Sequence, residues 1–128
     1  MAGQFAPSAD DLEQLARVAV DRLPEQFRVH IGPVVFVIED FAEEDVLAEL
    51  GIDDPFALTG LYSGRPIGEE RQTGDPPATI HLYRRPILDE WIESGEDLAH
   101  LVQHVVIHEI GHHFGLSDDD MHALEDEG

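Results

Sequence analysis

The stretch VVIHEIGHHFGLSD, from Val105 to Asp118, decides how this chain is interpreted. It contains the pattern HExxH at His108 to His112, followed by a glycine and an aspartate further along. Residues four apart lie on one face of an α-helix, about 6 Å from each other, so the two imidazoles can bind one cation. The stretch therefore predicts a metal site built on a helix.

The residues around the two histidines fit a catalytic metal site better than a structural one. Glu109 is rotated by about 100° from His108 on the helix, which places its carboxylate beside the metal rather than on it. Gly115 can take the left-handed conformation that ends a helix, and the reversed chain would bring Asp118 back to the metal. With His108, His112 and Asp118 as ligands, a zinc ion keeps its fourth position open for water.

This arrangement predicts the hydrolysis of an amide bond at one zinc ion. Zinc would lower the pKa of its water toward about 7 and polarise the scissile carbonyl. Glu109 would take the water proton as general base and later pass it to the leaving amine. We therefore expect Glu109 to be the catalytic residue and a peptide or protein to be the substrate.

The third ligand has alternatives. Ser117 with Asp120 fits a capping box, in which case Asp118 would be an acidic residue in the first turn of a last short helix. His122 is the best substitute as ligand. Two further candidates, if the tail folds back, are Glu125 and Glu127.

The histidines at positions 100, 104, 108 and 112 form a ladder with a spacing of four residues. Such a stripe drifts by about 40° per step, so we expect His100 to be structural and His104 to line the cleft or support the site. His113 points away from the face of its neighbour and is expected at the surface. His81 and Tyr83 are placed near the cleft, and packing is the favoured role for Tyr83.

The segment HEIGHHFGLSDDD resembles the signature of the short bacterial zincin-like metallopeptidases. The segments PVVFVIED, LTGLYSGRPI and TIHLYRRPI also resemble that family, so the likeness covers most of the chain after the first helix. The resemblance implies an α+β minimal zincin-like fold, with a small twisted mixed sheet packed by an N-terminal helix and the HExxH helix. It also implies a peptidase with a cleft at the sheet edge.

The motif HExxHxxGxxD is further similar to the metzincin pattern in which Asp replaces the third His. Metzincins carry a Met-turn well after the third ligand, whereas only 10 residues follow Asp118 here and Met121 is too close to it. In zincins an extended substrate pairs with an exposed strand edge, and TIHLYRR is the expected edge strand.

The hydrophobic pattern along the chain predicts alternating helices and strands. Ser8 precedes an amphipathic segment, and Leu12, Leu15, Ala16 and Ala19 fall on its apolar face. Three further helices are expected. One covers residues 43–50, a short one begins within residues 86–93, and a longer one spans residues 98–114. The expected strands are residues 34–39, 58–62 and 79–83.

Size and composition restrict the remaining possibilities. A chain of 128 residues predicts a single domain over 1–128, and the lack of cysteine leaves histidine and carboxylate as metal ligands. The net charge of −21 disfavours nucleic acid and membranes as partners. No basic and apolar leader begins the chain, so we expect a cytoplasmic protein. The chain is also expected to be a monomer.

Three other functions compete with the peptidase. A non-catalytic metal-binding or regulatory module would keep the zincin site and hydrolyse nothing. A metal-dependent endoribonuclease would need a positive surface and would not need a glutamate directly after the first histidine. A structural zinc site would favour four protein ligands and cysteine.

Overall fold

The computed structural model describes residues 6–25, 28, 34–63 and 78–114, with side chains described as far as Gly111. The elements follow an α+β order, as predicted. In chain order they are α1 (Ala9–Asp21), β1 (Val34–Glu39), α3 (Glu44–Leu50), the 3₁₀ turn η2 (Pro55–Ala57), β2 (Gly60–Ser63), β3 (Ala78–Tyr83), α4 (Arg84–Ser94) and α5 (Leu98–Phe114).

The three strands form one mixed sheet in the order β1-β3-β2. β1 runs parallel to β3, with Phe36 opposite Ile80, and β2 runs antiparallel to β3, with Leu61 opposite His81. The prediction that TIHLYRR is an edge strand is therefore wrong, because β3 is paired on both sides. The alternation of its side chains shows which face of the strand is buried. It does not show whether the backbone on either side of the strand is paired with a neighbouring strand.

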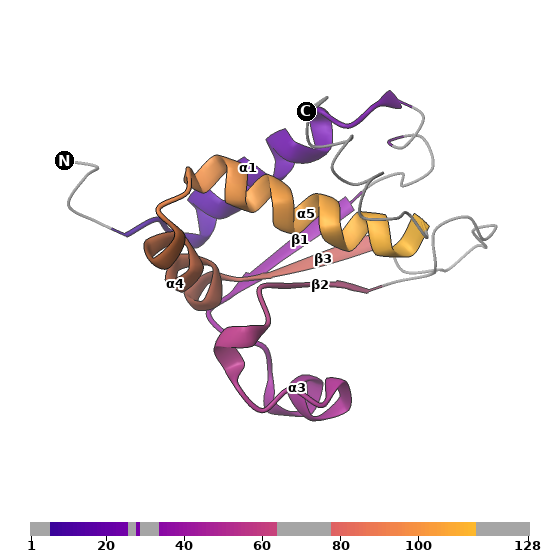
Figure 1. The fold of residues 1–128 in the computed structure, drawn as a ribbon. Coiled ribbons are helices and arrows are strands. Elements are labelled where there is room, and N and C mark those ends of the chain that lie inside the picture. The colour runs from indigo at the N-terminus through magenta and orange to yellow at the C-terminus, as the bar shows by residue number, and fades with distance from the viewer. Residues whose placement is uncertain (1–5, 26–27, 29–33, 64–77, 115–128) are drawn as a thin grey trace.

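One face of the sheet is covered by α1 and α5, which lie side by side across it (Figure 1). The core lies between these two helices and the sheet. Its fully buried side chains include Leu12 and Ala16 from α1, Ile80 and Leu82 from β3, and Val102 and Val106 from α5. Because burying a large aliphatic side chain contributes about 1.5–3 kcal/mol, this layer holds α5 against the sheet.

The N-terminus of α1 is closed by a capping box. The backbone N–H of Asp11 donates to Oγ of Ser8 at 3.2 Å, and the backbone N–H of Ser8 donates to the Asp11 carboxylate at 2.9 Å. These bonds satisfy two of the backbone donors that a helix start leaves unpaired. The predicted start of this helix at Ser8 is confirmed.

A second, smaller apolar cluster lies under the C-terminal ends of β1 and β3. It is formed by Ala42, Leu47 and Tyr83, with partly buried side chains from α3 and from the segment before β2. Gly51 follows the last residue of α3 with φ 70°, a conformation that glycine adopts without strain, and the predicted end of this helix at Leu50 is confirmed.

Helix α4 begins two residues before the segment from which it was predicted. Pro86 is its third residue. A proline is tolerated there because the first N–H groups of a helix have no partner within it. No helix in the described part of the chain is long and apolar enough to cross a membrane.

Candidate metal centre

The HExxH pattern lies on α5, a continuous helix from Leu98 to Phe114 with the predicted bounds. Its start is capped by Asp97, whose carboxylate accepts a hydrogen bond from the backbone N–H of His100 at 3.1 Å. The backbone of His108, Glu109 and His112 is therefore helical, and the two histidines are one turn apart on one face. The prediction that the motif lies on a helix is confirmed.

The rotation of α5 about its own axis is set by its apolar residues. Ile107 and Ile110, on either side of His108 and Glu109, are 1% and 0% exposed. His108 and Glu109 are themselves partly buried. Val105, three and four residues before them, shares their side of the helix and lies beside Gly60 of β2, so these two polar side chains follow the stripe of α5 that runs along β2.

The ring of His108 stacks on that of His104, one turn earlier on α5. The ring centroids are 5.8 Å apart and the rings are inclined by 23°. His104 is exposed, whereas His108 is partly buried. This position beside His108 agrees with the expectation that His104 lines or supports the site.

Glu109 lies against β2, which forms the edge of the sheet in the described part of the chain. A Cβ atom placed on Gly60 would lie 3.6 Å from Cγ of Glu109, an ordinary contact distance. The stem of this glutamate therefore runs beside the first residue of β2. The importance of Gly60 was missed at the sequence level, where the signal would have been a glycine inside a strand pattern.

Tyr83, at the end of β3, is the titratable group whose pKa is perturbed near the site. Burial raises the pKa of the Tyr83 phenol above its ordinary value of 10.0. Three carboxylates raise it further, in the order Glu39, Glu43 and Glu109. The negative charge of Glu109 is thus felt at the C-terminal end of the central strand. Tyr83 is 2% exposed and belongs to the smaller apolar cluster, so its predicted packing role is confirmed.

His81 lies on the same side of β3 as Tyr83, and their rings are stacked with centroids 6.4 Å apart. Its Nε2 is 3.2 Å from Oγ of Ser63 on β2. Its Nδ1 is buried, has no hydrogen-bond partner in the described part of the chain, and lies 4.0 Å from the Glu39 carboxylate. His81 thus lies between Ser63 of β2 and Glu39 of β1, on the face opposite the main core.

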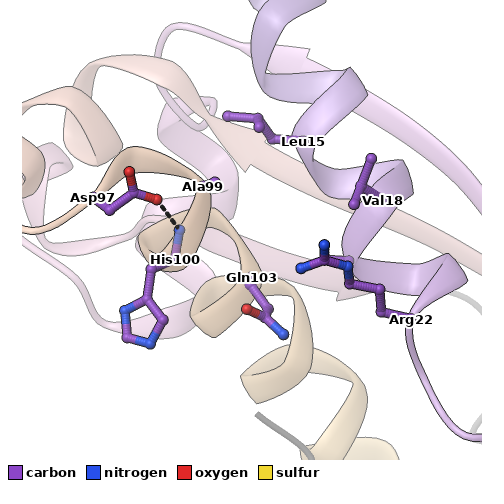
Figure 2. A pocket seen from close by; sticks show the side chains of 8 residues that line it. Leu15, Val18, Arg22, Asp97, Ala99, His100 and Gln103 are labelled. Carbon is purple, nitrogen blue, oxygen red and sulfur yellow. Dashed lines mark hydrogen bonds between the residues drawn. The ribbon is translucent and has the colours of Figure 1, made fainter. Parts of the chain in front are cut away.

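His100 lines a groove on a different flank of α5, between this helix and α1. The groove has a volume of about 250 Å³, and its other walls include Leu15 and Arg22 of α1 and Gln103 of α5 (Figure 2). Val105 contacts β2, and Gln103 precedes it by two residues. The side chains of Gln103 and Val105 are therefore about 200° apart around the helix, so the groove and β2 lie on different sides of α5. Nδ1 of His100 is within hydrogen-bond distance of the Glu96 carboxylate. These contacts support a structural role for His100.

Several predicted site residues lie outside the described part of the chain. These are Gly115, Asp118, Met121, His122, Glu125 and Glu127, together with the side chains of His112 and His113. Among the side chains that the structure describes, no group of three or more could hold a metal ion. The ligand set therefore stays a prediction.

The third ligand can be tested by alanine substitution. Asp118→Ala is expected to lower the affinity for zinc by about 10-fold or more, because it removes one of three charged or imidazole ligands. His122→Ala is the matched variant and is expected to leave the affinity unchanged. Competition with a chromophoric chelator measures both affinities, and a loss confined to His122→Ala would transfer the ligand role to His122.

Comparison with known protein families shows to which family a chain with this helical motif belongs. A sequence model of zincin-like metallopeptidases matches residues 31–128, which include all three strands and α5. The chain belongs to the zincin-like metallopeptidase family. The family match begins after α1, as the resemblance predicted, although α1 supplies Leu12 and Ala16 to the core of this zincin-like protein. No curated protein matches the chain.

Proposed function

We propose that this zincin-like protein is a zinc-dependent peptidase in which Glu109 is the general base. The observation that carries the proposal is the position of the HExxH helix. α5 packs on one face of the sheet, and the side chain of Glu109 begins beside Gly60 of β2. A base on a helix beside a strand that has no second partner strand in the described part of the chain suits the hydrolysis of an extended peptide.

The side chains proposed to hold zinc are those of His108, His112 and Asp118. Two imidazoles and one carboxylate suit this ion, and the described surroundings fit it. The His108 ring is partly buried and stacks on the ring of the exposed His104. When bound, zinc would supply Lewis-acid polarisation of the substrate carbonyl and acidify the attacking water.

Glu109 would transfer a proton from the attacking water to the leaving amine. One carboxylate oxygen accepts a proton from the attacking water as the water oxygen adds to the carbonyl carbon. The same oxygen then donates this proton to the nitrogen of the leaving amine as the C–N bond breaks. Cγ of Glu109 lies 3.6 Å from the place of a Gly60 Cβ atom, so this side chain starts beside the first residue of β2.

The strand proposed to bind the substrate is β2, in place of the segment first expected. β2 pairs with β3 on one side, and no strand pairs with its other side in the described part of the chain. A peptide in extended conformation could add there through backbone hydrogen bonds, which bind without reading much sequence.

The proposal is tested by metal analysis combined with a cleavage assay. We expect the purified protein to bind about one zinc ion and to cleave members of a broad peptide library. A chelator should abolish cleavage, and added zinc should restore it, because the polarised carbonyl and acidified water both depend on the ion. Binding of zinc without cleavage of any library member would favour the non-catalytic metal-binding or regulatory module instead.

A further inference from the structure

Gly60 is the first residue of β2, and its missing side chain would point at α5. A Cβ atom placed there would lie 2.8 Å from Cγ1 of Val105, 3.3 Å from the carbonyl oxygen of His81 and 3.6 Å from Cγ of Glu109. The first of these distances is shorter than a carbon–carbon contact allows. Among the described glycines only Gly51 and Gly95 have positive φ, so Gly60 is required for space rather than for an unusual backbone conformation.

The atoms around Gly60 have little freedom to move away from a methyl group. Val105 is 5% exposed and packs in the main core, and a valine in a helix has one strongly preferred χ1 rotamer. The carbonyl of His81 belongs to the central strand, which is paired on both sides. A methyl group at position 60 would therefore be accommodated mainly by moving β2 away from α5.

We propose that Gly60 is a positioning residue of the peptidase site: the space at this position sets the separation between the edge strand β2 and Glu109. The proposal rests on the proposed function and deepens it. A peptide paired with β2 moves with that strand, whereas Glu109 is fixed to α5. The separation of the two elements thus decides whether the carboxylate reaches the attacking water.

The expected effect is on turnover rather than on substrate binding. A general base must lie within about 2.6–3.2 Å of the atom whose proton it takes, and a misplacement by about 1 Å can cost on the order of 100-fold in rate. The backbone hydrogen bonds between the peptide and β2 would be preserved, because both shift together. Gly60→Ala should therefore lower kcat and leave KM nearly unchanged.

The experiment compares the wild type with Gly60→Ala, Val105→Ala and the double variant. Each is measured for bound zinc, thermal unfolding, kcat and KM with one cleavable peptide. Gly60→Ala is expected to retain its zinc and KM and to lose about 10-fold or more in kcat. Val105→Ala is the control for destabilisation alone, because it leaves a cavity in the core without a group that pushes β2 away.

The double variant gives the decisive comparison. Removing Cγ1 of Val105 relieves the shortest contact, so the double variant should unfold at a higher temperature than Gly60→Ala and recover much of the kcat of Val105→Ala. The contact with the His81 carbonyl remains and makes this recovery partial. This comparison also applies if Gly60→Ala alone does not fold.

Three outcomes would each overturn a different part of the proposal: the positioning role of Gly60, its steric cause, or the peptidase function on which it rests. Wild-type cleavage with an unchanged kcat in Gly60→Ala would overturn the positioning role alone. Equal loss of kcat in Gly60→Ala and in the double variant would overturn the steric cause. Zinc-loaded wild type that cleaves no peptide would overturn the proposed function and the positioning role with it, even if the unfolding temperatures show that residues 60 and 105 are in contact.

Discussion

Replacement of Glu109 by glutamine is expected to lower kcat by about 10²- to 10⁴-fold while the protein still binds zinc. The amide has nearly the same shape as the carboxylate and can keep its place beside Gly60, but it cannot accept the proton of the attacking water. Glu109 is beside the predicted metal position and is not one of its ligands. Single-turnover cleavage and zinc content, measured on the same preparation, check both parts of this expectation.

A matched control is available in Glu43→Gln. Glu43 is exposed and precedes α3, and like Glu109 it is one of the carboxylates that raise the pKa of Tyr83. Glu43→Gln removes a negative charge near Tyr83, as Glu109→Gln does, but changes nothing on α5. Because position 43 is away from the reacting atoms, kcat should stay within about 2-fold of the wild type. Substantial peptidase activity in zinc-loaded Glu109→Gln would rule out the general-base role.

The local features of the chain were predictable because their signals are local. The start of α1 after Ser8, the end of α3 at Leu50 and the helical spacing within residues 98–114 each involve neighbours within one or two turns. The family resemblance rested on segments from PVVFVIED onward, and the matched span of 31–128 agrees with it. Helix propensity, capping and the hydrophobic period act over such short distances along the chain, so local features can be predicted from the sequence.

The order of the strands was not predictable in the same way. TIHLYRR has alternating side chains and one buried face, which both edge and central strands can show. Its central position depends on β1 pairing in parallel over a long connection and on β2 pairing from the other side. The role of Gly60 depends on the same pairing, because only the placement of β2 against Val105 and Glu109 makes a side chain at that position costly.

Removal of a proposed metal ligand should have the largest effect on the metal itself. His108→Ala is expected to lose zinc binding and, with it, all chelator-sensitive cleavage. The remaining side chains, His112 and one carboxylate, are fewer than the three protein ligands of a catalytic zinc site. Because His108 is only partly buried, the substitution should leave a folded protein, which circular dichroism can verify.

His100→Ala is the matched control, since it removes the same side chain from the same helix. His100 is exposed, lies beside the groove toward α1 and is bonded to Glu96, so it faces away from Glu109 and β2 (Figure 2). We expect this variant to keep both zinc and activity. Equal loss of zinc in the two variants would show that the histidine ladder binds metal elsewhere along α5, and retention of zinc in His108→Ala would exclude His108 as a ligand.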